Sequence, residues 1–71
     1  MTRTLGQRIS GLRAEYGLSL EEVAKAAGIS EQLLQDIEHD RVECSLEIAV
    51  KLALLFDVSV NMLVTGLNDP V

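Results

Sequence analysis

The feature that most constrains the fold of this chain is the stretch SLEEVAKAAGISEQLLQDIE, which runs from Ser19 to Glu38. Ser19, with Glu22 three residues later, offers the reciprocal pair of side chains that caps the start of a helix. Gly28 can adopt the left-handed conformation that ends a helix. The stretch therefore predicts two short helices that meet at Gly28, the first of which begins near Leu20.

The second of these helices is expected to start after Ser30, which is another good N-cap residue. Apolar residues recur at the spacing of one helix face and are expected to point inward: Leu33, Leu34 and Ile37. Polar residues fill the outer face: Glu31, Gln32, Gln35 and Asp36. Two helices joined across a turn of about three or four residues that contains a glycine are typical of the helix-turn-helix motif.

This stretch resembles the Cro/repressor-type helix-turn-helix family, often called XRE. The family pattern has an alanine in the first helix, a glycine and an aliphatic residue in the turn, and an Ile-Glu pair in the second helix. The matching positions are Ala24, Gly28, Ile29, Ile37 and Glu38. The similarity extends from about residue 5 to residue 66 and implies a lambda-repressor-like DNA-binding domain.

Three further helices are expected outside this stretch, because N-cap residues and helical apolar spacing recur there. They are one helix from Thr4 with Gln7 to about Tyr16, stopped by Gly17; one from Ser45 to Phe56; and one from Ser59 to about Val64, ended by Gly66. Residues 39–44 are expected to form a loop. We therefore expect a single all-α domain of five short helices over residues 1–71, with its core at about 5–66 and a tail at 67–71.

The expected fourth helix is apolar nearly all round. One face is expected to carry Leu46, Ala49, Val50, Ala53 and Phe56. Further apolar residues lie on its other faces: Ile48, Leu52, Leu54 and Leu55. Because a helix with this pattern is typically surrounded by protein, we expect it to be buried on most sides.

Apolar residues near the C-terminal end predict a contact with a second copy of the chain. They are Leu54, Val58, Val60, Met62, Val64 and Leu67, more apolar surface than a monomer would be expected to expose. Family resemblance implies a two-fold dimer that pairs through this end. We expect an interface containing Leu54, Val58, Val60 and Val64, although Leu54 alone could equally belong to the core.

The charge of the chain is unevenly distributed, and its net value is −5. Residues 1–13 carry three arginines and no acid, whereas residues 14–71 carry three basic residues against all eleven acids. DNA binding depends largely on contacts between basic groups and phosphates. An acidic protein therefore needs a local basic patch to bind DNA tightly.

Resemblance to the family implies that the third helix lies in the major groove of DNA. Its candidate base contacts are Glu31, Gln32, Gln35 and Asp36, among which a glutamine amide can bond both N6 and N7 of adenine. Candidate phosphate contacts are Ser30, Arg41, and either Arg8 or Arg3 on or before the first helix. The alternative is that the polar face of this helix is merely solvated.

Three positions depart from the family pattern. Leu20 stands where a glutamine commonly opens the second helix, Asp40 stands where a glycine follows the third, and Cys44 replaces a loop proline. Between residues 29 and 47 there are six acids and one base. This charge would weaken contact with a DNA duplex and make it sensitive to salt.

The resemblance also places an arginine on the first helix against the glutamate that ends the third. We therefore expect a structural, non-catalytic salt bridge between Arg13 and Glu38. The alternative is that these are two unrelated surface charges.

Little in the chain points to catalysis, a metal or a membrane. His39 and Cys44 are the single histidine and cysteine, too few for a zinc site, and we expect no cofactor and no enzyme activity. The longest apolar run, Leu52 to Phe56, is far too short to cross a membrane. One cysteine cannot form an intrachain disulfide, which fits a reducing cytoplasm.

These observations predict a sequence-specific, double-stranded DNA-binding transcription regulator that acts as a small dimeric repressor. The alternative is a protein-interaction module on the same fold, such as an antirepressor, an antitoxin-type partner-binding unit or a DNA mimic. This alternative would use the acidic face of the third helix to bind a protein partner.

Overall fold

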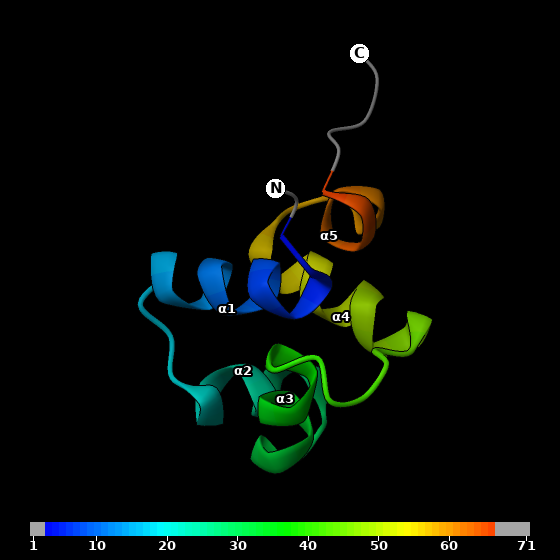
Figure 1. Cartoon of the computed structure of the whole chain (residues 1–71). Coiled ribbons are helices and arrows are strands. Elements are labelled where there is room, and N and C mark those ends of the chain that lie inside the picture. The colour runs from blue at the N-terminus through cyan, green and yellow to red at the C-terminus, as the bar shows by residue number, and fades with distance from the viewer. Residues whose placement is uncertain (1–2, 67–71) are drawn as a thin grey trace.

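The computed structural model describes residues 3–66, within which five helices and no strands are found (Figure 1). The helices are α1 (Leu5–Glu15), α2 (Leu20–Ala27), α3 (Glu31–Glu38), α4 (Leu46–Phe56) and α5 (Val60–Thr65). The predicted all-α fold is therefore confirmed. Leu67 and the expected tail at 67–71 lie outside the described residues.

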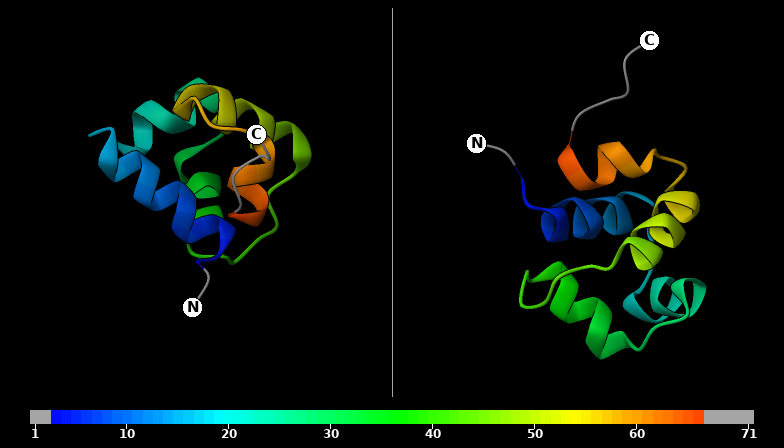
Figure 2. Two further views of the ribbon diagram at one scale, coloured as in Figure 1. Left: turned by 90° about the horizontal axis from the view of Figure 1, so that it is seen from above. Right: turned by 90° about the vertical axis from the view of Figure 1, so that its right-hand side faces the viewer.

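Helix α1 occupies the middle of the arrangement. Figure 1 and the right-hand view of Figure 2 show α5 on one side of α1 and the α2–α3 pair on the other. Helix α4 packs against α2, α5 and α1. The helix-turn-helix pair therefore forms one end of the molecule, and α5 lies at the opposite end.

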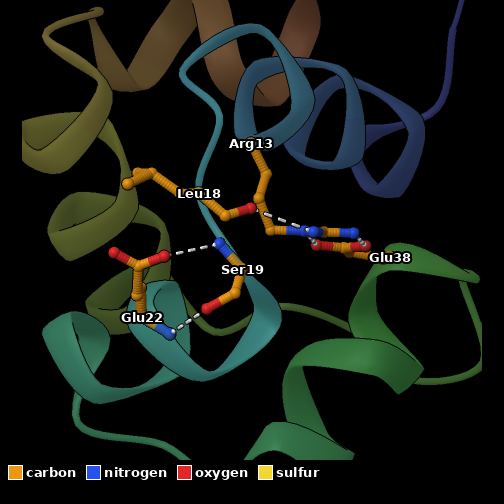
Figure 3. Close-up of polar contacts among 5 residues, drawn as sticks. All are labelled: Arg13, Leu18, Ser19, Glu22 and Glu38. Atoms are coloured by element: carbon orange, nitrogen blue, oxygen red, sulfur yellow. Dashed lines mark hydrogen bonds and ion pairs between the residues drawn. The ribbon is translucent and has the colours of Figure 1, made fainter.

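Every helix begins at the serine or threonine that the sequence predicts. In each case the hydroxyl oxygen accepts a hydrogen bond from a backbone amide three residues later, and the N-caps are Thr4, Ser19, Ser30, Ser45 and Ser59. In α2 the carboxylate of Glu22 also accepts from the Ser19 amide at 3.0 Å (Figure 3). The backbone amide and the hydroxyl of Ser19 together lower the pKa of Glu22.

The first four helices end in the same way, at a residue with a positive φ. After α1 and α2 this residue is Gly17 or Gly28, as the sequence predicts, but after α3 and α4 it is Asp40 (φ 58°) or Asp57 (φ 55°). After α3, for example, the amide of Asp40 donates to the Ile37 carbonyl at 3.1 Å. The two aspartates occupy a conformation that glycine adopts at lower cost.

The two aspartates differ in what their carboxylates do, which predicts opposite effects of substitution by glycine. The Asp40 carboxylate accepts from the Thr4 hydroxyl at 2.5 Å and from the Gly6 amide at 3.1 Å, whereas Asp57 makes no side-chain hydrogen bond within residues 3–66. Asp57→Gly should raise the free energy of unfolding by about 0.5 kcal/mol through relief of backbone strain. Asp40→Gly should lower it by about 1 kcal/mol, because two charge-assisted hydrogen bonds are lost.

Urea denaturation of both variants measures this difference. If Asp40→Gly stabilised the protein as much as Asp57→Gly, the carboxylate of Asp40 would have no part in holding α1 to the end of α3.

The core is mainly aliphatic. Its largest fully buried side chains are Ile9, Val23, Leu34, Ile37, Leu52, Phe56 and Leu63. Phe56 is its one aromatic member, and the ring of Tyr16 packs edge-on against it at a centroid distance of 5.5 Å. The Tyr16 hydroxyl donates to the Phe56 carbonyl at 2.7 Å, which ties the end of α1 to the end of α4.

The expectation that α4 is buried on most sides is wrong. Its buried residues are Ala49, Leu52, Ala53 and Phe56, but Leu46, Val50 and Leu54 are 71%, 38% and 77% exposed. These three residues follow one another at intervals of four and so line one side of the helix. Only one face of α4 can reach its neighbours, which leaves this apolar stripe in solvent.

Candidate nucleic-acid interface

The outer face of α3 presents polar side chains on a well-anchored helix. Leu34 and Ile37 are buried on its inner face, and Ala24 and Ala27 of α2 are buried beside them in the same core. Small side chains in α2 allow the two backbones to approach closely. On the opposite face of α3, three of the predicted contact residues are exposed: Glu31, Gln32 and Gln35.

The fourth predicted base contact, Asp36, is engaged with its neighbours. Its Oδ1 accepts from Nε2 of Gln32 at 3.0 Å and from the guanidinium of Arg41 at 3.3 Å. The Asp36 side chain is 25% exposed, whereas that of Arg41 is 60% exposed. The carboxylate of Asp36 therefore lies between a glutamine and an arginine, both of which still face solvent.

Ion pairs offset part of the acidity around α3. Three of the six acids between residues 29 and 47 pair with a basic residue: Asp36 with Arg41, Glu38 with Arg13, and Glu47 with Lys51. Asp40 accepts hydrogen bonds from the Thr4 hydroxyl and the Gly6 amide, which are neutral and do not compensate its charge. Because three acids have basic partners, the surface around α3 is less repulsive to phosphate than the sequence count suggests.

Arg13 and Glu38 form a bidentate ion pair between α1 and α3 (Figure 3). Nε and a terminal nitrogen of Arg13 donate to the two carboxylate oxygens at 2.8 and 3.2 Å, and the other terminal nitrogen donates to the Leu18 carbonyl at 3.1 Å. Within residues 3–66, Glu38 is the one charged residue that is buried. Its carboxylate raises the pKa of Arg13 further. The pair fixes the end of α3 to both α1 and the start of α2.

Arg8 lies away from the other predicted phosphate contacts. Its guanidinium donates to the carbonyls of Leu63 at 2.7 Å and Val64 at 2.5 Å, and also to the Arg3 carbonyl. All three of its nitrogens are thus used where α1 meets α5. Arg8 therefore lies outside the candidate DNA surface.

The other two predicted phosphate contacts lie at the two ends of α3. Ser30 caps the start of the helix by accepting from the Leu33 amide at 3.0 Å, and its hydroxyl hydrogen can still be donated. Arg41 follows the end of the helix. A helix with a hydroxyl at one end and a guanidinium at the other can be held between phosphates.

The predicted interface residues near the C-terminal end divide into two groups. Leu54 and Val64 are exposed, at 77% and 45%, whereas Val58 and Val60 are half-buried and pack against the core. The alternative that Leu54 belongs to the core is therefore excluded. Two side chains of the predicted apolar interface, Leu54 and Val64, are therefore available to a partner. Leu46 and Val50, which lie on the same exposed stripe of α4 as Leu54, extend this apolar surface.

Two residues that position α3 were missed at the level of sequence. Gly6 is buried where α1 crosses the end of α3, and a Cβ at this position would lie 2.6 Å from the Glu38 carbonyl oxygen. Asp40 caps α1 from the loop after α3. The replacement of the family's glycine by Asp40 was the signal that could have pointed to this contact.

Within residues 3–66 no three histidine, cysteine or acidic side chains are grouped as metal ligands. Cys44 is partly buried, and this burial raises the pKa of its thiol, so the thiolate is disfavoured. None of the helices in this part of the chain has the length and apolar character needed to cross a membrane.

Comparisons with known proteins agree with this geometry. A helix-turn-helix family model matches residues 9–63. The HTH-type transcriptional regulator DdrOP3 of Deinococcus deserti is 40% identical over 64 residues, which are 90% of this chain and 50% of that protein. The match to SinR of Bacillus subtilis covers 54% of its length, so this chain spans about half of these relatives.

Solved structures show the same architecture. SinR, the master regulator for biofilm formation, has been solved in complex with DNA; it is 38% identical, with a TM-score of 0.78 over 84% of this chain and 97% of that one. The P22 c2 repressor in complex with a synthetic operator has a TM-score of 0.86 at 23% identity, covering 92% of this chain and 98% of that one. This last likeness shows the repressor-like fold.

Proposed function

The chain belongs to the Cro/repressor-type helix-turn-helix family, and we propose that it is a sequence-specific, double-stranded DNA-binding transcription regulator. The observation that carries the proposal is the outer face of α3, where Gln32 and Gln35 are exposed while three of the six nearby acids pair with basic residues. The DNA complex of SinR, a relative with the same fold, supports it.

In this proposal α3 enters the major groove and α2 braces it from behind. Gln32 and Gln35 read base edges, and Glu31 can accept a hydrogen bond from N4 of cytosine. Ser30 and Arg41 contact phosphates and so fix the position of the helix on the duplex. Bound at a promoter, the protein would block or recruit polymerase.

Loss of both glutamine side chains should abolish specific binding. The duplex upstream of the protein's own gene is titrated with the wild type and with Gln32→Ala/Gln35→Ala, at about 50 and 200 mM salt. We expect the wild type to bind this duplex in the presence of excess competitor DNA, and to bind it more weakly at the higher salt. The double variant should bind this duplex no more tightly than it binds an unrelated duplex. A control variant, Glu21→Ala on exposed α2 surface, should retain specific binding.

Two outcomes would contradict the proposal. One is the absence of binding by folded wild-type protein even at the lower salt. The other is specific binding that the double variant retains in full.

We also propose that the protein acts as a homodimer. Exposed apolar side chains on α4 and α5, Leu54 and Val64, support a two-fold pairing in which two α3 helices reach half-sites about one DNA turn, or about 34 Å, apart. Leu54→Glu should shift the protein from dimer to monomer in sedimentation and leave its melting temperature nearly unchanged after correction for dissociation. Sedimentation of the wild type as a monomer at all accessible concentrations would contradict the pairing.

The protein-interaction module on the same fold is not favoured by these comparisons, since the curated relatives are transcription regulators. Their role also supports our expectations of a non-enzymatic and cytoplasmic protein. A protein partner in addition to DNA is compatible with the exposed apolar stripe on α4.

A further inference from the structure

We propose that Asp36 is a positioning residue that holds the Gln32 amide in one orientation and thereby sets which bases it accepts. The inference rests on the proposed DNA-binding function and concerns its specificity. It begins from the Gln32 Nε2 and Arg41 guanidinium donors, which share the Oδ1 of Asp36 at 3.0 and 3.3 Å.

The backbone after α3 brings these groups together. Because Asp40 has a positive φ, the chain reverses, and the amide of Arg41 donates to the Asp36 carbonyl at 2.9 Å. This hydrogen bond holds Arg41 beside the last turn of α3. The guanidinium thus reaches Asp36 from the C-terminal side, while Gln32 reaches it from one turn earlier.

The charges of Asp36 and Arg41 determine which of its two orientations the Gln32 side-chain amide adopts. The two ends of an amide are nearly equal in size, so an isolated glutamine can present either its oxygen or its nitrogen to a base. An ionised carboxylate only accepts hydrogen bonds, and Arg41 only donates them. Nε2 of Gln32 must therefore face Asp36, which directs Oε1 away from it.

The fixed amide predicts a class of base. Within residues 3–66, Oε1 of Gln32 accepts no hydrogen bond and is available as an acceptor. In the major groove, adenine offers a donor at N6 and cytosine at N4, whereas guanine and thymine offer only acceptors. The position read by Gln32 is therefore an adenine or a cytosine, and Asp36 enforces this choice without contacting the DNA.

Selection from a pool of duplexes with a randomised central stretch tests the inference. The position that Gln32 reads is the one whose base preference disappears in Gln32→Ala. At this position we expect the wild type to prefer adenine or cytosine over guanine and thymine by about ten-fold. Asp36→Ala should reduce that preference to about two-fold or less, because the amide is then free to rotate.

Asp36→Asn is the matched control. It removes the same charge as Asp36→Ala, so both variants should gain similar overall affinity for DNA through reduced repulsion of phosphate. The asparagine oxygen, however, can still face Arg41 and accept from Gln32. Asp36→Asn should therefore keep most of the wild-type base preference, whereas a purely electrostatic role would make the two variants alike.

The side-chain amide of Gln32 gives a second measurement that needs no DNA. In nuclear magnetic resonance spectra of the free protein, its Nε2 protons should be shifted from free-glutamine values in the wild type and in Asp36→Asn, but not in Asp36→Ala. Equal spectra for all three proteins would overturn the inference.

The selection distinguishes a failure of the proposed DNA-binding function from a failure of the role proposed for Asp36. A wild type that enriches no sequence would overturn the proposed function. Two outcomes would overturn only the role of Asp36, provided that the wild type enriches a sequence. One is a preference for guanine or thymine at the position read by Gln32, and the other is a base preference there that Asp36→Ala retains.

Discussion

Replacing Arg13 by alanine is expected to lower the free energy of unfolding by about 3 kcal/mol, a large part of the stability of a domain of this size. The substitution leaves the carboxylate of Glu38, whose side chain is only 6% exposed, without its bidentate partner. A stranded buried charge costs more than the pair contributes when intact. Because Arg13 itself is 23% exposed, we place the loss at the lower end of the range for buried pairs.

Two controls separate the stranded charge from a general effect of substitution. Glu47→Ala breaks the Lys51 ion pair, which spans 3.6 Å between exposed side chains, and should cost less than about 0.5 kcal/mol. Arg13→Met/Glu38→Leu replaces both charges by apolar groups and should recover at least half of the loss, because no charge is left stranded. Urea denaturation gives all three values. If Arg13→Ala were as stable as the wild type, Arg13 and Glu38 would behave as two unrelated surface charges, and the predicted structural role of the ion pair would be wrong.

Gly6→Ala should be comparably damaging, with a loss of about 3 kcal/mol. A Cβ on residue 6 would lie 2.6 Å from the Glu38 carbonyl oxygen, closer still to the Ile37 carbonyl, and 2.7 Å from Oδ1 of Asp40. Two of these neighbours are backbone atoms of α3, which cannot move without shifting that helix. The substitution would also disturb the bond from the Gly6 amide to Asp40.

Gly11 in the same helix provides the control. A Cβ there would meet only a terminal nitrogen of Arg3 at 3.0 Å, the far end of a flexible side chain. Gly11→Ala should therefore be neutral or should stabilise α1 by up to about 1 kcal/mol, since alanine is the better helix former. Thermal unfolding of the two variants distinguishes them, and equal melting temperatures would contradict the close crossing of α1 and α3.

Local signals explain why the helices could be predicted from sequence. An N-cap hydroxyl such as that of Ser30 satisfies amides within its own first turn, and a glycine such as Gly28 ends its own helix, so both act over a few residues. The ends of α3 and α4 fall where they were predicted, but the positive φ of Asp40 and Asp57 was not predicted, because aspartate rarely adopts this conformation.

Features set by contacts between helices could not be predicted in the same way. The need for glycine at residue 6 arises from carbonyls of α3 more than 30 residues away in the chain. The exposure of Leu46 and Val50 depends on which face of α4 meets its neighbours. Apolar periodicity alone does not define that face when the helix is apolar nearly all round.

The candidate site shows the same division. Its outward-facing residues, Gln32 and Gln35, follow from helical spacing alone. The role of Asp36 could not be predicted, because its partner Arg41 is brought to it by the turn at Asp40. The position of Arg8 away from the candidate DNA surface could not be predicted either, because its guanidinium donates to a carbonyl of α5. Helix α5 lies across α1 from the helix-turn-helix pair (Figure 2).

The proposed function requires that the outer face of α3 is the surface that contacts DNA. Backbone amide shifts of labelled protein, followed while the duplex from upstream of its gene is added, test this most directly. We expect the largest changes from Ser30 to Asp36 and at Arg41, with little change at Tyr16 or in α5 beyond any effect of dimer formation. Changes confined to the apolar stripe of Leu46, Val50 and Leu54, with α3 unaffected, would contradict it.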